Sequence, residues 1–213
     1  MFVSYISNNF YTQPEPSFRA CLVEKVKPKI VIDNVTFLNN KTAMLKEGVP
    51  FFDGIKLFID TTKHILQNNL EWITTFDNIE LMRFLNILRK FPKEPFEKRK
   101  MYGIIGTGAY KTAFLLDKKE VLCACDNMKV FKERPFEDFD LPILSEGYCD
   151  KHGEFGWFIR NHGKPINEKE LKSIEERILE KGYSFEDWYE DQCCKFKNKI
   201  YLLDFECVKK KKM

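Results

Sequence analysis

The chain has 213 residues, of which 44% are hydrophobic and 15% aromatic, so it can bury a core and is not a disordered tail. Its formal net charge of +3 is small and comes largely from the lysine run at 209–212, which argues against a nucleic-acid-binding surface over the whole protein. No apolar run approaches the roughly 18 residues that span a bilayer, so no transmembrane segment is expected.

Residues 1–100 are predicted to form an extension that is mostly helical after residue 53 and packs on the rest of the chain. Residues 29–38 carry the β-branched content of a strand. A helix of period 3.6 follows from Asp53, and its apolar face consists of Ile55, Phe58, Ile59, Thr62, Ile65 and Leu66. A second helix begins at Asp77, with Glu80 as its capping-box partner, and its expected apolar face is Ile79, Met82, Leu85 and Leu88.

From residue 101 the sequence favours strands. Apolar runs at 102–105, 113–116 and 121–125 predict three strands, and the polar turn at 117–120 joins the last two as a hairpin. Residues 157–160 form a further strand candidate, and residues 200–203 the last one. Asn167 and Glu170 make a capping box for a helix that runs to about Lys181 and is closed by Gly182.

Two glycines lie between the first two of these strands, in the stretch Gly106-Thr107-Gly108-Ala109-Tyr110-Lys111. Glycine lets the backbone approach phosphate oxygens without a Cβ in the way, and the backbone amides can then donate to them. The stretch is not a Walker loop, because no Gly-Lys-Ser/Thr follows and the next element is a strand. The same argument excludes a Rossmann fingerprint.

Two carboxylates follow at informative positions. Asp187 precedes Gln192 by five residues, which spaces a carboxylate and a side-chain carbonyl as a catalytic loop does. Asp204 comes 17 residues after Asp187, at the end of the strand candidate at 200–203 and before Phe205-Glu206. Carboxylate and amide oxygens are the ligands that Mg²⁺ prefers in proteins.

The order glycine loop, catalytic loop and metal-binding Asp resembles the protein-kinase superfamily over about residues 101–206. The resemblance implies ATP and Mg²⁺ as cofactors. By this resemblance, Asp187 accepts or orients the proton of the attacking hydroxyl, and Asp204 and Gln192 bind the metal ion. The superfamily has Asn in place of Gln192, and the Asp-Phe-Glu ending is also similar to choline-kinase-like and aminoglycoside-kinase-like members.

The lysine that protein kinases carry on their third strand is missing, because that position falls on Cys125 or Asp126. Lys111 instead stands where the last glycine of the loop would be. The stretches GTGAYKTAF and EVLCAC resemble the with-no-lysine kinases, in which a lysine of the loop or second strand replaces the missing one. By this resemblance Lys111 binds the phosphates, and the alternative is a solvated strand lysine in a degenerate site.

The resemblance implies further ATP contacts. A carboxylate from a short helix after the third strand, within residues 131–146, should pair with Lys111, and of the three available, Glu133, Glu137 and Glu146, we favour Glu137. The strand at 157–160 leads into a hinge at 161–163 whose backbone faces adenine, so Phe158 and Arg160 join Gly106, Thr107 and Gly108 as ATP-binding residues.

The sequence therefore predicts an α+β protein with a minimal kinase-like core at 101–213, built from a small antiparallel sheet and a reduced helical lobe. The expected activity is ATP- and Mg²⁺-dependent phosphoryl transfer to a protein hydroxyl, as in compact viral or bacterial-effector kinases. The sequence ends nine residues after Asp204, without room for an activation loop, so a small-molecule kinase and a catalytically dead pseudokinase stay open as alternatives. Seven irregularly spaced cysteines without a signal peptide indicate a reducing compartment, the cytoplasm or nucleus of the organism itself or of a host cell.

Overall fold

The computed structural model describes residues 3–5, 30–32, 34–128, 139–185, 192–203 and 208–210. Within them the chain forms one nine-stranded antiparallel sheet in the order β1-β2-β3-β4-β5-β6-β7-β9-β8. Its strands are β1 (Val3–Tyr5), β2 (Ile30–Ile32), β3 (Val35–Phe37), β4 (Ala43–Pro50), β5 (Lys100–Thr107), β6 (Lys111–Leu116), β7 (Glu120–Cys125), β8 (Ile143–Tyr148) and β9 (Gly156–Asn161). The mixed α+β class is confirmed, although the sheet is larger than expected.

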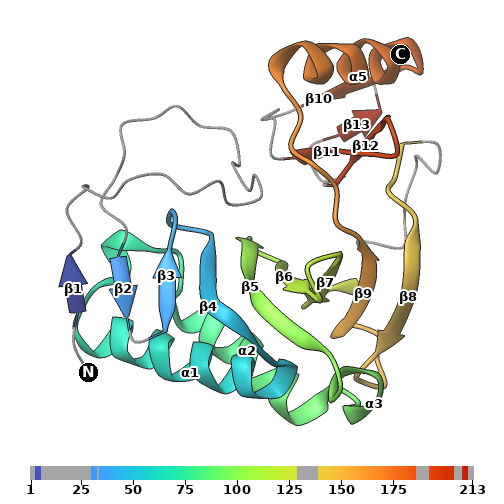
Figure 1. The fold of residues 1–213 in the computed structure, drawn as a ribbon. Helices are drawn as coiled ribbons and strands as arrows, with labels where there is room; N and C mark the ends of the chain where they lie inside the picture. Colours follow the sequence, from blue (N-terminus) through green and yellow to red (C-terminus); the bar gives the residue numbers. More distant parts are fainter. Residues whose placement is uncertain are drawn as a thin grey trace.

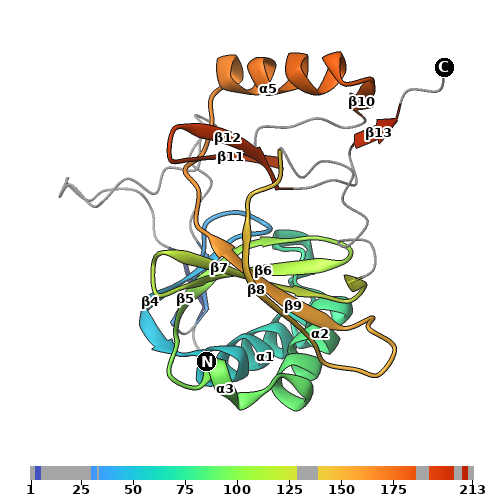
Figure 2. The same cartoon turned by 90° about the vertical axis from the view of Figure 1, so that its right-hand side faces the viewer.

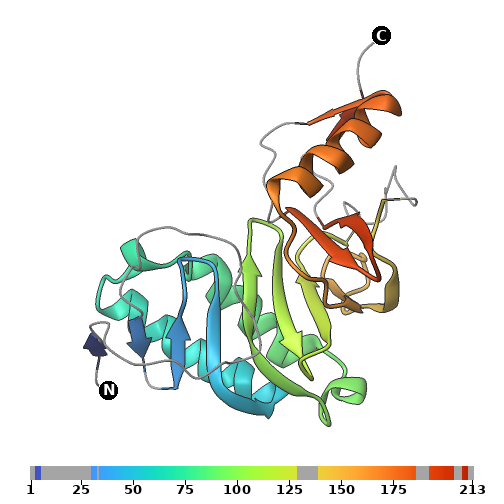
Figure 3. The ribbon, with the colours of Figure 1, turned by 45° about the horizontal axis from the view of Figure 1, so that its top comes forward.

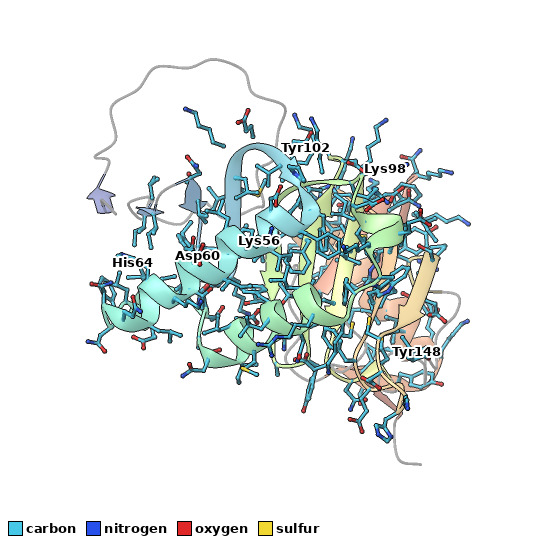
Figure 4. All side chains as sticks on the ribbon, turned by 90° about the horizontal axis from the view of Figure 1, so that it is seen from below. Lys56, Asp60, His64, Lys98, Tyr102 and Tyr148 are labelled. Carbon is cyan, nitrogen blue, oxygen red and sulfur yellow. The ribbon has the colours of Figure 1, made fainter. Side chains whose placement is uncertain are left out.

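Two helices, α1 (Phe51–Gln67) and α2 (Asn78–Lys90), cover one face of this sheet (Figure 1). The main core lies between them and the strands, and it is rich in aromatic rings, among them Phe51, Phe58, Phe76, Phe84, Phe96 and Phe114. The short helices η1 (Glu71–Ile73) and α3 (Lys93–Phe96) flank α2. Along the outer side of α1 lie Lys56, Asp60 and His64 (Figure 4).

A small unit lies on the other side of the sheet (Figures 1 and 2). It holds helix α5 (Glu168–Glu180), the pair β10 (Tyr183–Phe185) and β13 (Val208–Lys210), and the hairpin β11 (Cys193–Phe196) and β12 (Lys199–Leu202). A second core cluster joins α5 to these strands through Ile174, Ile178, Cys193 and Leu202. None of the helices in the described parts of the chain is both long and apolar enough to cross a membrane.

The N-terminal region extends the sheet of the C-terminal region. Strand β4 pairs with β5 in a register that includes Ala43 opposite Ile104 and Pro50 opposite Lys100. The single strand expected at 29–38 is wrong in one respect, because β2 and β3 are separate strands paired through Ile30 and Phe37. Strand β4 was not predicted; it pairs with β3 just before it and with β5, whose residues lie fifty or more positions further along the chain.

Helix α1 has the face that its sequence predicts. It begins directly after Pro50, and the predicted residues Ile55, Phe58, Ile59, Thr62 and Ile65 are buried. Leu66 is half-buried and lies at the edge of this face. The periodicity alone was sufficient here because every residue of the buried face except the two threonines, Thr61 and Thr62, and Gly54 is apolar.

Helix α2 begins as predicted, with the Asp77 carboxylate accepting from the amides of Ile79 and Glu80, but its expected apolar face is wrong. The side chains of Ile79 and Met82 are 56% and 53% exposed. The buried residues are Glu80, Arg83, Phe84 and Ile87, and Leu85 and Leu88 pack at the edge of the core. Glu80 is not a capping-box partner either, because its carboxylate accepts from the Arg83 Nη1 at 2.6 Å. The buried face of α2 therefore includes the Glu80–Arg83 ion pair and differs from the face that the apolar periodicity predicts.

The Glu80 carboxyl makes stability depend on pH. Burial raises its pKa from 4.5 to about 7; Arg83 and the hydrogen bond from Thr112 act in the opposite direction, while Asp77 and Asp126 add to the rise. A carboxyl with a higher pKa in the folded than in the unfolded protein stabilises the fold below the unfolded pKa, and this contribution is lost as pH rises through the folded pKa.

We therefore expect the free energy of unfolding to fall by up to about 3 kcal/mol between pH 4.5 and 7 because of Glu80. The variant Glu80→Gln should lack this component, so its stability should depend less on pH than that of the wild type. Urea unfolding of both proteins at about pH 5 and about pH 8 measures the difference. The same pH slope in both proteins would show that Glu80 is ionised throughout.

Local signals in the C-terminal region are confirmed. In the three-residue connection between β6 and β7, the Lys119 amide donates to the Leu116 carbonyl at 3.0 Å, and Asp117 and Lys118 between them have φ of 48° and 60°, as both central residues of a type I′ turn require. Both hydrogen bonds of the Asn167–Glu170 capping box are present at the start of α5. Gly182, at φ 82°, follows the last turn of that helix.

Strand β8 was missed, and with it the placement of Glu146. The segment 131–146 was expected to hold a short helix, but residues 143–148 form an edge strand paired with β9. Glu146 is exposed on that strand, opposite Phe158. Of the other two glutamates considered, Glu133 and Glu137 lie outside the described residues.

Candidate active site

The glycine loop connects β5 and β6 in a tight turn, with the Gly108 amide donating to the Lys111 carbonyl at 2.9 Å. A Cβ added at Gly106 would meet no atom within 4 Å, and one at Gly108 only that carbonyl oxygen at 4.0 Å. Neither residue has a positive φ, in contrast to Gly103, Gly153 and Gly182. The protein's own packing therefore does not require glycine at 106 and 108, and a ligand could approach the backbone there.

Lys111 lies directly opposite Cys125 in the pairing of β6 with β7. Residues opposite each other in an antiparallel pair project from the same face of the sheet, so Lys111 reaches the surface from which a lysine at 125 would project. Because Thr112 contacts Arg83 of α2, Lys111 projects from the face away from α2. Burial raises the pKa of Cys125 well above its usual value, although the positive charge of Lys111 opposes this.

Arg160 of β9 is the second cation on this face. Its side chain is 4% exposed, and its guanidinium stacks on the Phe158 ring at 4.8 Å. Its Nη1 lies 3.8 Å from the Asp140 Oδ1. Its Nη2 lies 3.8 Å from the Cys123 Sγ on the neighbouring strand. Arg160 is therefore buried on the same face of the sheet as Lys111 and Cys125.

Both cations meet the end of β12. The Lys111 Nζ and the Arg160 Nη2 each lie 3.3 Å from the Leu203 carbonyl oxygen. The Leu203 amide donates to the Gln192 carbonyl at 2.7 Å, which pairs the residue after β12 with the residue before β11. These contacts join the small unit to the sheet next to the glycine loop. The turn between β5 and β6 points toward the small unit (Figure 3).

The structure brings together some of the predicted site residues. Lys111, Arg160 and the backbone of Gln192 converge on Leu203, the residue that precedes Asp204 in the sequence. Asp187, Asp204 and Glu137 lie outside the described residues. Among the described residues, no group of three His, Cys, Asp or Glu side chains could hold a metal ion.

The side chains of two predicted ATP-binding residues, Thr107 and Phe158, make contacts inside the protein. The Thr107 hydroxyl lies 2.7 Å from the Thr75 hydroxyl, which in turn donates to the Asn40 carbonyl at 2.9 Å. Phe158 is buried in a small cluster with Val121, Cys123, Cys125 and Met128. The side chain of Thr107 therefore contacts the N-terminal region, so in this arrangement only its backbone is available to a ligand.

The predicted hinge leads from β9 into the small unit. The His162 amide donates to the Lys119 carbonyl at 2.8 Å, and Lys164 and Lys195 exchange two backbone hydrogen bonds of 2.8 Å. Burial lowers the pKa of His162, so this ring tends to be neutral.

Asp140 is the site residue that the sequence did not indicate. It precedes Leu141-Pro142 without a motif of its own, and its backbone forms a parallel bridge with Leu202. The bridge, together with the hydrogen bond from the Leu202 amide to the Phe139 carbonyl at 2.7 Å, joins Asp140 to the strand end that Arg160 also contacts.

No protein-family model and no curated protein matches this sequence. Two cations, Lys111 and Arg160, and a turn whose glycines are not required by packing make a site suited to an anionic ligand.

Proposed function

We propose that this protein transfers the γ-phosphoryl group of ATP to a hydroxyl group of a protein, with Mg²⁺ as cofactor. The observation that carries the proposal is the position of Lys111. It lies beside the glycine loop and opposite Cys125, and its ammonium group contacts the carbonyl of the residue before Asp204. In the proposed site, the phosphate-binding lysine contacts the chain neighbour of the predicted metal ligand Asp204, although it comes from a different strand than in most protein kinases.

The proposed roles follow from this arrangement. The loop amides and Lys111 bind the phosphates, while the partly buried apolar surface of Ile105 and Ala113 beside Val121 accepts the purine base. Asp187 orients the substrate hydroxyl and accepts its proton as the oxygen bonds to the γ-phosphorus. The bond between that phosphorus and the β,γ-bridging oxygen breaks, and ADP leaves.

Residues 204 and 192 fit a magnesium ion by the chemistry of their donors, a carboxylate and an amide oxygen. The hydrogen bond between Leu203 and Gln192 places the chain neighbour of Asp204 beside Gln192. When bound, Mg²⁺ would neutralise charge on the β- and γ-phosphates. Glu137 stays the proposed carboxylate partner of Lys111.

Incubation of the purified protein with γ-labelled ATP and Mg²⁺ tests the proposal. Label should move to the protein itself or to an added protein substrate, and Asp204→Asn should abolish the transfer. Label on a small alcohol would favour the small-molecule kinase. ATP binding without any transfer would favour a pseudokinase that acts as a binding module, and the absence of ATP binding would contradict all three.

The glycine loop offers a second test. Gly106→Ala and Gly108→Ala should leave the free energy of unfolding unchanged within about 0.5 kcal/mol, because a Cβ meets open space at both positions. Both should raise the KM for ATP by about tenfold, since the added Cβ separates the backbone amides from the phosphates.

The matched control is Gly103→Ala on the same strand. Gly103 has φ 153° and its added Cβ would clash with the Ala43 carbonyl oxygen. This variant should lose about 1–3 kcal/mol of stability. Unchanged ATP affinity in both loop variants would exclude the loop from nucleotide binding.

A further inference from the structure

An arginine of the N-terminal region binds the turn of the glycine loop from the side that faces α2. Arg83 of α2 is 1% exposed. Its Nη1 donates to the Gly108 carbonyl at 3.2 Å and its Nη2 to the Ala109 carbonyl at 2.9 Å. A residue 25 positions before the loop in sequence thus binds two successive carbonyl groups of the loop.

The guanidinium itself is held by groups from three elements. The Asp126 Oδ2, just after β7, accepts from Nε at 2.8 Å and from Nη2 at 2.6 Å. Nη1 also lies 2.6 Å from the Glu80 Oε1 and 2.8 Å from the Thr112 hydroxyl, so its two hydrogens are shared among these two acceptors and the Gly108 carbonyl. The Thr112 hydroxyl donates to the other Glu80 oxygen at 2.7 Å. All three guanidinium nitrogens are therefore bonded, which leaves the group a single orientation.

This orientation determines where the loop amides point. A trans peptide group is planar, so its C=O and the N–H of the next residue point in opposite directions. The only cis peptide bond among the described residues is Glu94–Pro95. With the carbonyls of Gly108 and Ala109 directed at Arg83, the N–H groups of Ala109 and Tyr110 are directed away from α2. Lys111 projects from the side of the sheet opposite α2.

We propose that Arg83 is a positioning residue for the nucleotide, because it turns two successive loop amides toward the phosphates that Lys111 binds. The inference rests on the proposed function, since it takes ATP as the ligand. It makes α2 a part of the phosphate site, although no atom of α2 contacts the nucleotide.

Arg83→Lys tests this proposal because it keeps the buried charge. A lysine has a single side-chain nitrogen, so it cannot donate hydrogen bonds to Asp126, Glu80 and both loop carbonyls at the same time. We expect its affinity for ATP to fall by about tenfold while its affinity for adenosine, which has no phosphates, is unchanged. The KM for ATP should rise in the same proportion, with a much smaller change in kcat. Calorimetry with ATP and with adenosine provides the affinities.

The control is Arg99→Lys. Arg99 also bridges two carboxylates, Asp117 and Glu120, but at the end of the β6–β7 hairpin far from the loop. This variant should bind ATP and adenosine as the wild type does. If circular dichroism shows that Arg83→Lys does not fold, Asp126→Asn is measured in its place, with the same expected results. Asp126 binds the Arg83 guanidinium group, and its own side chain is partly exposed.

The outcomes separate the two proposals. A wild type that does not bind ATP overturns the proposed function and this inference with it. A wild type that binds ATP, with a folded Arg83→Lys of unchanged ATP affinity, overturns the inference alone. An equal loss of affinity for ATP and adenosine would also overturn it, because misfolding of the whole site, and not loss of phosphate contacts, would then be the cause.

Discussion

Lys111→Met is expected to reduce phosphoryl transfer by about a hundredfold or more. In the proposed reaction, the change removes a positive charge from beside the developing charge on the phosphoryl group, which corresponds to about 3 kcal/mol or more of transition-state stabilisation. The fold should survive, because Arg160 still donates to the Leu203 carbonyl. Transfer from γ-labelled ATP, measured beside thermal unfolding, gives both quantities.

The matched control is Lys119→Met, at the other end of the same hairpin, where the lysine side chain is exposed. It should keep full activity. A sharper variant adds Cys125→Lys to Lys111→Met. Because the two positions are direct cross-strand partners, a lysine at 125 should recover part of the lost activity. Near-full turnover by Lys111→Met alone would show that another group binds the phosphates.

A chain that begins at Lys100 is expected not to fold. Strand β5 would lose its pairing with β4, and the sheet face that carries Phe114, Leu116 and Leu122 would lose α1 and α2. Each large apolar side chain taken out of the core costs roughly 1.5–3 kcal/mol. Several such losses exceed the 5–15 kcal/mol that is typical of a whole domain's stability.

Circular dichroism and binding of a hydrophobic dye test this prediction on the fragment 100–213. The full-length protein should unfold in one cooperative transition, with the helix and the aromatic signals changing together. A folded fragment that binds ATP would show that the N-terminal region is a separate domain. It would also contradict the role inferred for Arg83, because the fragment lacks α2.

Elements with signals that are local in sequence could be predicted from the sequence alone. Helix α5 has a capping box at its start and a glycine at its end, and the β6–β7 hairpin has a polar turn between two apolar strands. Helix α1 has a continuous apolar face. The proximity of Lys111 to the third strand also follows from short spacing, because the three-residue connection at 117–119 brings residues 111 and 125 opposite each other. The turn expected at 117–120 would have shifted this register by one residue.

Other features depended on contacts between distant parts of the chain. The pattern of α2 suggested that Ile79 and Met82 face the core, yet Glu80 and Arg83 do. Only the tertiary structure supplies Asp126, Thr112 and the loop carbonyls that bond to these charges, and without such partners their burial would be too costly. The contacts of Arg160 with Asp140 and with the Leu203 carbonyl likewise depend on the tertiary fold, which brings β9 next to the end of β12. Periodicity ranks residues by polarity, but the cost of burying a charge depends on its neighbours in space, and these are set by the tertiary fold.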